Sequence, residues 1–421
     1  MLSYLKSLGS AIACATLFVF VGASNGQAQD TIKVGVIQPT AGVCAQWGIP
    51  VIEGAKMWAD EHNQQGGLLV GDGKRYLLEV TAYDNVCYVP GEEIKAARRA
   101  VADGVDVMLQ TFTPASREAI AKIVTDAKIL TTSYGAGFLS DDYPYLIGGI
   151  TGTPTSMMQL TSHVAETRPE LKRYAFLHMD LSFGLAGQAY ALAGIAPHSD
   201  TVEVVYDELY APDATGDMLG LLTPMFQSNP DVIVELGLSP GQKAVLLEIS
   251  EQFGYEGVFL STGWTNSFLE ERISLDDFTG RLYHAYGLDG SVSSYAPRGH
   301  EAYKRWVEEN GLENWSVYAS LSYGVFVGLE PGYSKATGPS GEELLAALTS
   351  MDTIEHPLFG PSQWGGGDIY GADHHLLTPL PLYLLGDNGF IVDAVVDHAQ
   401  WWEEHGEKAL PVLDSGGQVY K

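Results

Sequence analysis

A regular alternation of strand and helix patterns is the feature that most restricts how this chain folds. From Thr31 onward, short apolar runs alternate with amphipathic stretches of roughly 10–15 residues, which predicts βαβ units and parallel sheets. The expected strands are 32–38, 76–83, 105–110, 129–133, 173–178, 201–206, 231–235 and 258–260. The expected helices between them are 49–64, 91–102, 116–127, 154–167, 183–196, 216–227 and 241–253.

The alternation occurs in two successive runs, with a turn at 141–144 between them. Each run covers about 120 residues, which fits two similar lobes better than one very wide sheet. The chain beyond Arg281 is less regular, with expected helices at 296–310 and 315–329 and a Gly- and Pro-rich stretch at 357–371. We interpret this part as return crossings between the lobes and as terminal packing.

The first 28 residues have the pattern of a cleavable export signal. Lys6 supplies a minimal positive region, residues 11–23 supply an apolar run, and Gly26 and Ala28 are small residues at a cleavage site. The apolar run is too short for a membrane span. We therefore expect a periplasmic location, where Cys44 and Cys87 form a candidate disulfide, with two independent thiols as the alternative.

Acidic residues greatly outnumber basic ones. The chain has 52 Asp and Glu against 23 Lys and Arg, and a formal net charge of −29. Such a surface repels phosphate backbones and anionic membranes, so we expect no nucleic-acid partner. We interpret the excess of acid as a solubility feature.

The residues directly after each expected strand carry the functional prediction, because ligands of open parallel sheets bind beyond the carboxyl ends of the strands. These residues are mainly hydroxyl-bearing, glycine or large aromatic, whereas converging acids, bases and metal ligands are scarce. That inventory favours holding a molecule over breaking one, so we expect no catalytic residues, no metal and no cofactor. The segments are 39–48, 111–116, 133–137, 180–184, 236–239 and 261–264.

These segments also carry a family resemblance. From about Ile32 to Asp393 the chain resembles the type I periplasmic binding proteins of the branched-chain amino acid (leucine-binding) importer class. The matching stretches, in this order, are VGVIQPTAG, EGAKMWADEHNQQGG, TAYDNVCYVPGEEIKAARRAV, TPAS, TSYGAG and DLSFGLAG. The resemblance implies an α/β fold of two doubly wound parallel-sheet lobes joined by three hinge crossings. The expected N-terminal lobe covers 29–149 and 287–362, and the C-terminal lobe covers 150–286 and 363–421.

The resemblance also implies ligand contacts. An aromatic from the first lobe caps the ligand, the loops after the third and fourth strands meet a carboxylate, and a second aromatic closes over it from the other lobe. Carried onto this chain, the expected ligand-binding residues are Trp47, Thr113, Pro114, Ala115, Ser116, Tyr134, Gly135, Ala136, Phe183, Leu236, Gly263 and Trp264.

Two departures from the amino-acid binders affect the expected ligand. Those proteins commonly carry an acid in the loop matched by 261–264, to hold the ligand ammonium, whereas this chain has Gly263 and Trp264 there. They also carry a serine where this chain has Pro114, which has no backbone N–H. An α-amino acid therefore needs another anchor, such as Asp180 or a carbonyl, and the aromatics suggest a flat or apolar ligand.

Two further motifs are interpreted as structural. Residues 237–241 match the G-x-S-x-G nucleophile elbow, but Pro240 cannot give the N–H that an oxyanion hole needs. Ser239 is then a helix N-cap with Pro240 as the first helical residue. His374 and His375 are adjacent, so on a strand they point to opposite faces and make awkward metal ligands.

The sequence thus predicts a monomeric solute receptor of an ABC importer, with a small-molecule ligand and an inner-membrane permease as partners. The expected ligand is an apolar or branched-chain amino acid, and an aromatic or aliphatic carboxylate or a short amide is the alternative. A different class, a secreted α/β hydrolase that uses Ser239, is the competing hypothesis.

Overall fold

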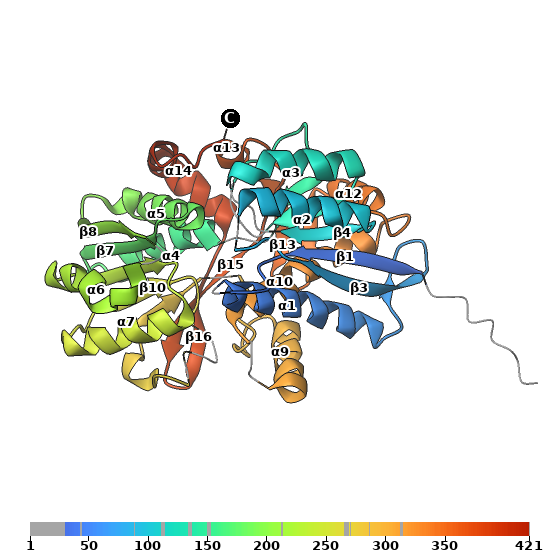
Figure 1. Cartoon of the computed structure of the whole chain (residues 1–421). Helices are drawn as coiled ribbons and strands as arrows, with labels where there is room; N and C mark the ends of the chain where they lie inside the picture. Colours follow the sequence, from blue (N-terminus) through green and yellow to red (C-terminus); the bar gives the residue numbers. More distant parts are fainter. Residues whose placement is uncertain are drawn as a thin grey trace, which may run out of the picture.

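Two α/β lobes lie side by side in the structure, a computed structural model of the whole chain (Figure 1). The structure describes residues 30–42, 44–87, 89–110, 114–133, 137–149, 153–211, 214–264, 269, 271–285, 287–311 and 315–420. The predicted export signal lies outside these residues. Among the described residues, no helix is both long enough and apolar enough to cross a membrane.

The N-terminal lobe is built on a nine-stranded sheet with the order β12-β13-β14-β6-β5-β4-β1-β3-β2. Its central strands pair in parallel, and β2, β12 and β13 add antiparallel edges. The strands are β1 (Thr31–Ile37), β2 (Leu68–Leu69), β3 (Arg75–Tyr83), β4 (Val107–Gln110), β5 (Leu130–Ser133), β6 (Leu146–Gly148), β12 (Thr353–His356), β13 (Gly360–Gly365) and β14 (His375–Leu377).

The helices of this lobe cover both faces of its sheet. Successive residues of a strand point to opposite faces, and the strands carry apolar residues on both faces, so each face packs against helices. Ile32, Val34 and Val36 of β1 pack in the core on the side of α1 and α10, whereas Ile37 packs on the side of α2 and α3. The helices are α1 (Ala45–Asn63), α2 (Pro90–Ala102), α3 (Pro114–Ala127), α9 (Pro297–Asn310), α10 (Val317–Val327), α11 (Glu330–Tyr333), α12 (Gly341–Thr349) and α13 (Gly367–Tyr370).

The C-terminal lobe has a seven-stranded sheet with the order β16-β15-β11-β10-β9-β7-β8. Helices α4 and α5 pack on one face and α6 and α7 on the other. The strands are β7 (Arg173–Met179), β8 (Glu203–Tyr210), β9 (Val232–Leu236), β10 (Val258–Ser261), β11 (Leu282–His284), β15 (Leu380–Gly386) and β16 (Gly389–Val396). The helices are α4 (Thr153–Thr167), α5 (Ser182–Ile195), α6 (Met218–Gln227), α7 (Pro240–Gln252) and α14 (His398–Ser415), with short 3-10 turns η1 (Ala196–His198), η2 (Ala214–Asp217) and η3 (Asp276–Phe278).

The sheet order places three crossings between the lobes. The chain leaves the first sheet after β6, returns after β11, and crosses again between β14 and β15. The predicted lobe boundary at residue 362 is therefore wrong in one respect, because β13 runs to Gly365 and β14 still belongs to the N-terminal sheet. Strand β14 extends the first sheet beside β6, so the third crossing comes later than predicted.

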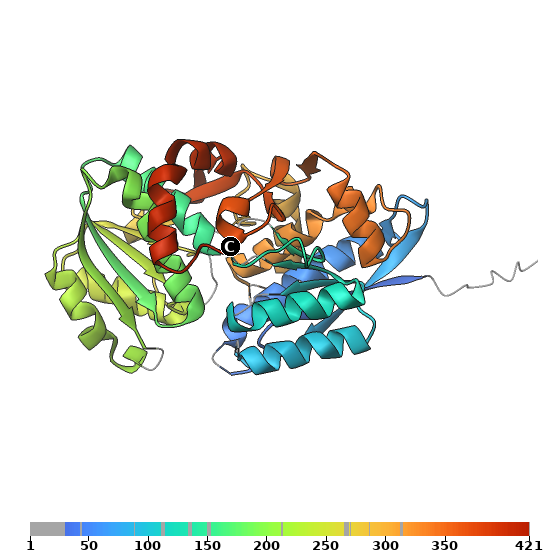
Figure 2. The same cartoon turned by 90° about the horizontal axis from the view of Figure 1, so that it is seen from above.

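The C-terminal end of the chain returns to the region where the lobes meet (Figure 2). Helix α14 packs against α5 of the second lobe, and Tyr420 then donates its backbone N–H to the carbonyl of Ile369, at 2.8 Å. Strands β2, β6, β11 and β12 to β16 and helices α11 to α14 were not predicted individually from the sequence, whereas the order of the strands and helices that were predicted agrees with the structure. The predicted α/β class with two lobes of largely parallel sheet is confirmed.

Candidate functional site

Side chains from both lobes meet beside the ends of α1, α10 and β10. The hydroxyl of Tyr318, on α10, lies near the Trp47 and Thr262 side chains, and both of these side chains influence its pKa. Trp47 belongs to the N-terminal lobe and Thr262 to the loop after β10 in the C-terminal lobe. Next to them, Gly263 packs closely on Val317. We call Trp47, Thr262, Gly263, Val317 and Tyr318 the lobe junction.

Glycine is required at Gly263 by the closeness of the two lobes. A Cβ atom at this position would lie 2.4 Å from Cγ1 of Val317, which is too short for a real contact. Burial raises the pKa of Tyr318, so its hydroxyl stays protonated and is able to donate a hydrogen bond. The lobe junction thus combines two aromatic rings, two hydroxyl groups and a tightly approached backbone.

The first turn of α1 is fixed from two sides, which sets the position of Trp47. Cys44, directly before the helix, forms a disulfide with Cys87, with 5.4 Å between the Cα atoms. Gly48 lies against the loop after β1, and a Cβ atom there would come within 2.0 Å of the Pro39 carbonyl oxygen. The predicted pairing of the two cysteines is present in the structure.

A buried charged network supports the loop after β10. The Lys243 ammonium, on α7, donates to the Ser261 hydroxyl and to the Gly263 carbonyl, both at 2.7 Å. Ser261 in turn donates to Glu235 of β9, at 2.8 Å. Lys243 is 4% exposed and Glu235 is fully buried, so this network lies inside the C-terminal lobe. A buried ion pair of this kind needs such additional hydrogen bonds to offset its desolvation.

Arg117 performs a similar supporting task in the N-terminal lobe. Its Nε donates to the Phe138 carbonyl, at 2.9 Å, and its guanidinium lies where a Cβ atom on Gly137 would stand, at 2.5 Å from one nitrogen. Burial lowers the pKa of Arg117 to about 10. The arginine thus packs against the chain that follows β5, a role that no periodic pattern in the sequence predicts.

The structure describes five of the other predicted site residues. Trp47 and Gly263 belong to the lobe junction, and Phe183 is half-buried in the first turn of α5, packed against the C-terminal core. Pro114 starts α3 and Ala115 is exposed beside it. Thr113, Tyr134, Gly135 and Ala136 lie outside the described residues.

Ser116 has a different partner from the one expected. Its side chain is buried, and its hydroxyl donates to the buried carboxylate of Glu93 on α2. The hydroxyl therefore ties the start of α3 to α2.

Two predicted ligand contacts are wrong, because their side chains belong to the core. Trp264 is fully buried, and its indole N–H donates to the Tyr283 carbonyl at 3.0 Å. Its ring also packs edge-on against Phe259. Leu236 is 2% exposed and fills the space left by Gly187, where a Cβ atom would collide with Cδ2 of the leucine at 1.5 Å.

The sequence analysis named neither Tyr318 nor Thr262 as a candidate site residue. Thr262 was inside a segment singled out as a loop after a strand, but Tyr318 lies 50 or more residues farther along, in the region interpreted as a return crossing. Its position on the first turn of α10, next to the N-cap Ser316, is what brings the ring toward the C-terminal lobe.

The structure agrees with the structural interpretation of the two rejected motifs. Ser239 caps α7 in a reciprocal capping box with Gln242, with Ser239 N donating to Gln242 Oε1 at 2.8 Å and Gln242 N to Ser239 Oγ at 3.3 Å. His374 lies 3.2 Å from Asp141, whereas His375 is buried against the Tyr370 ring. The two imidazoles therefore have separate surroundings.

The sequence and the fold are both similar to known receptors. Residues 31–389 match the family described as periplasmic binding protein. The Leu/Ile/Val-binding protein of Escherichia coli (strain K12) is 22% identical over 353 residues, which are 83% of this chain and 91% of that protein.

Two solved structures illustrate the likeness of the fold. A leucine-binding protein from Thermotoga maritima has a TM-score of 0.67 at 16% identity, over 88% of this chain and all of that chain (100%). A solute-binding protein from R. palustris in complex with 4-hydroxybenzoate has a TM-score of 0.65 at 18% identity, over 87% of this chain and 96% of that chain.

The chain therefore belongs to the periplasmic binding protein family. The family and the fold predicted from the sequence are confirmed.

Proposed function

We propose that the chain is an exported receptor of an ABC importer, which captures a small apolar molecule between its lobes and delivers it to an inner-membrane permease. The observation that carries this proposal is the lobe junction, where Tyr318 and Trp47 of one lobe meet Thr262 of the other. A ligand held by both lobes stabilises their closed arrangement, because it binds that arrangement better than the open one.

The composition of the site supports binding over catalysis. In the described part of the chain, the buried charges beside the junction, Glu235 and Lys243, are paired with each other and with Ser261. Ser239, the candidate nucleophile of a hydrolase, is engaged as a helix cap. We infer that the protein is not an enzyme and needs no cofactor.

Relatives suggest two ligand classes. The Escherichia coli relative is named a Leu/Ile/Val-binding protein, whereas the R. palustris neighbour was solved with 4-hydroxybenzoate. An apolar or branched-chain amino acid and an aromatic or aliphatic carboxylate are therefore both candidates, with a short amide as a further alternative. The protein acts as a monomer in the periplasm in this proposal.

A ligand screen tests the proposed function. The full-length gene is expressed in a host that exports it, N-terminal sequencing checks for cleavage after Ala28, and the purified protein is screened by thermal shift against amino acids, aromatic and aliphatic acids, and amides. A true ligand at about 100 times its Kd adds about 2.7 kcal/mol to the free energy of unfolding. Small-angle scattering should then show a more compact particle with the ligand.

The proposal fails if no compound of the three classes raises the melting temperature, or if ligand leaves the scattering unchanged at saturation. Ligand-dependent esterase or amidase activity of the purified protein would instead support the hydrolase hypothesis.

A further inference from the structure

A pocket lies between α13 and the start of α14, away from the lobe junction (Figure 1). Its volume of about 520 Å³ is large enough for a small organic molecule. Its walls are the end of β13, α13, Asp373 and Leu377 from the N-terminal lobe, and the first two turns of α14 from the C-terminal lobe. No described lining residue belongs to the lobe junction, so the pocket is a separate candidate site.

Glycines shape the wall on the side of the N-terminal lobe. A Cβ atom on Gly366 would lie 2.6 Å from the ring of Tyr370, and one on Gly367 would lie 2.7 Å from Oδ1 of Asp373. Gly366 also has a φ of 90°, which a residue with a side chain rarely adopts. Side chains at these two positions would therefore displace residues that form the pocket.

The lining is aromatic and acidic. Trp364, Trp402, Asp368 and Asp373 belong to it, and none of the described lining residues is Lys or Arg. Asp368 Oδ2 accepts from Nε1 of Trp402 at 3.4 Å, which links the two lobes. Asp373 Oδ1 accepts the backbone N–H of Gly367 at 2.7 Å. Each carboxylate is thus positioned by one hydrogen bond and has further acceptor sites, since a carboxylate offers about four lone pairs.

His398 adds a buried polar group to the pocket wall. The residue is 3% exposed, and its Nδ1 is hydrogen-bonded to the Gln159 side chain. Its other ring nitrogen, Nε2, has no hydrogen-bond partner among the described residues. Burial lowers the pKa of His398 to about 4, so the ring carries no charge at neutral pH. A hydroxyl group on a bound molecule would give Nε2 the partner that it lacks.

The N-terminus of α14 does not make the pocket a site for anions. A free helix N-terminus attracts negative charge. Here Asp397 already caps the helix, and its carboxylate accepts the backbone N–H of Gln400 at 3.0 Å. A bound anion would be repelled by this acid and by Asp368 and Asp373.

We propose that the pocket between α13 and α14 binds a small organic cation that carries a hydroxyl group. The indoles of Trp364 and Trp402 hold the cationic head, because a cation is attracted to the face of an aromatic ring. Asp368 and Asp373 balance its charge, and His398 binds the hydroxyl group. The net charge of −29 draws cations toward the protein from a distance. The proposal does not depend on which molecule the receptor carries between its lobes.

Three compounds of nearly the same shape test the proposal by isothermal titration calorimetry. Choline is the cation, 3,3-dimethylbutan-1-ol is its neutral counterpart, and 3,3-dimethylbutanoate is an anion. We expect choline to bind at least about tenfold more tightly than the alcohol, and its Kd to rise with added salt, which screens the attraction. An alcohol or anion that binds as tightly as choline overturns the proposal, and so does the absence of choline binding up to about 10 mM.

Variants locate the binding site. Asp373→Asn removes a charge and keeps an acceptor for the Gly367 N–H, so the Kd of choline should rise about fivefold and that of the alcohol should not change. Trp402→Leu should raise the Kd of choline about tenfold. Asp277→Asn on η3 and Trp306→Leu on α9 are the matched controls, an exposed acid and a half-buried indole that do not line the pocket.

The pattern across the variants separates this pocket from other sites. If the Kd of choline is the same in Asp373→Asn and in the unaltered protein, choline binds elsewhere and the proposal is wrong, and this result decides even if Trp402→Leu does not fold. If the Kd rises in Tyr318→Phe and not in the pocket variants, choline binds at the lobe junction, which contradicts the proposal and leaves the receptor function standing. The receptor function itself is decided separately, by the ligand screen.

Discussion

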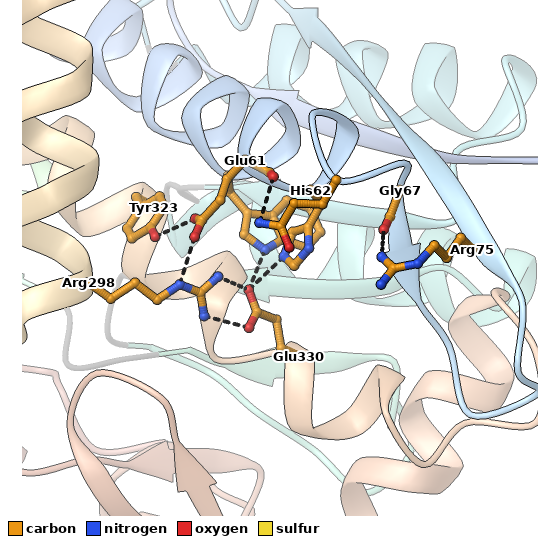
Figure 3. A network of polar contacts seen from close by, with 9 residues as sticks. Glu61, His62, Gly67, Arg75, Arg298, Tyr323 and Glu330 are labelled. Carbon is orange, nitrogen blue, oxygen red and sulfur yellow. Dashed lines mark hydrogen bonds and ion pairs between the residues drawn. The ribbon is translucent and has the colours of Figure 1, made fainter.

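Arg298 of α9 and Glu330 of α11 form a two-pronged ion pair, with nitrogen–oxygen distances of 2.7 and 2.6 Å (Figure 3). Arg298 also binds Glu61 of α1 at 3.0 Å, so one guanidinium joins three helices. Burial alone would raise the pKa of Glu330, but hydrogen bonds from His62 and Arg298 lower it to about 2. The ion pair between Arg298 and Glu330 therefore stays charged across the physiological pH range.

Replacing this arginine should destabilise the N-terminal lobe. In Arg298→Met, two largely buried carboxylates lose their shared counter-ion, and we expect the free energy of unfolding to fall by about 2–4 kcal/mol. Urea denaturation at pH 7 measures the change. Lys304→Met, which breaks an exposed pair, should cost less than about 0.5 kcal/mol, and equal losses in the two variants would refute the prediction.

Buried histidines should make stability fall steeply in mild acid. Burial lowers the pKa of His178, His356 and His375 to about 3 and that of His398 to about 4. In the unfolded chain these groups titrate near pH 6.5, so the unfolded state binds more protons below that value. Stability is complete above about pH 6.5 and is lost as the pH falls toward the folded pKa values.

A single substitution isolates one of these histidines. His178 stacks on Phe176, and neither of its ring nitrogens has a partner within the described chain. Between pH 7.5 and pH 5, His178→Phe should lose about 2 kcal/mol less stability than the unaltered protein, as measured by urea denaturation at both values. The same loss in both proteins would show that His178 is not a neutral buried group.

The disulfide should stabilise the chain and the start of α1 together. The bond between Cys44 and Cys87 closes a loop with a sequence separation of 43. Restricting such a loop in the unfolded chain contributes about 3–4 kcal/mol to the free energy of unfolding. The double variant Cys44→Ser/Cys87→Ser should therefore unfold at a clearly lower temperature. Reductant should lower the melting temperature of the unaltered protein and leave that of the double variant alone, and a reductant-insensitive unaltered protein would contradict this.

Ser239 should matter for stability and not for hydrolysis. Loss of its capping box in Ser239→Ala should cost about 1 kcal/mol. Ser340→Ala is the matched control, because Ser340 caps α12 in the same reciprocal way with Glu343. Both variants should resemble the unaltered protein in hydrolysis of a chromogenic ester, and a loss confined to Ser239→Ala would revive the hydrolase hypothesis.

The Tyr318 hydroxyl should contribute to ligand affinity through the lobe junction. Tyr318→Phe removes the hydroxyl that lies near Thr262 and Trp47, and we expect the Kd of the ligand found in the screen to rise about fivefold, the equivalent of one hydrogen bond. Tyr323→Phe is the control on the same helix, since the Tyr323 hydroxyl binds Glu61 inside the N-terminal lobe at 2.6 Å (Figure 3). If the Kd rises equally in both variants, the Tyr318 hydroxyl has no specific role in ligand binding.

Much of the fold was readable from local patterns. The order of the predicted strands and helices up to β10, which did not include β2 and β6, follows from apolar periodicity, and the cap at Ser239 follows from the short Ser-Pro-Gly-Gln sequence, because both depend on neighbours within a few residues. The return strands β12 to β16 were harder to predict, since a strand at a sheet edge is defined by the partner that it meets. Leu236 is an example for a single side chain, because its burial against Gly187 depends on a residue far away in the sequence.

The sequence alone determined the α/β alternation and the absence of an acid at Gly263, because each is a property of consecutive residues. Only the tertiary structure decided that Trp47 lies at the lobe junction while Trp264 lies in the core. It also decided that Lys243 reaches Glu235 and Ser261. The reason is physical: a buried aromatic or charge is stable only with the right partners around it, and folding gathers those partners from separate elements.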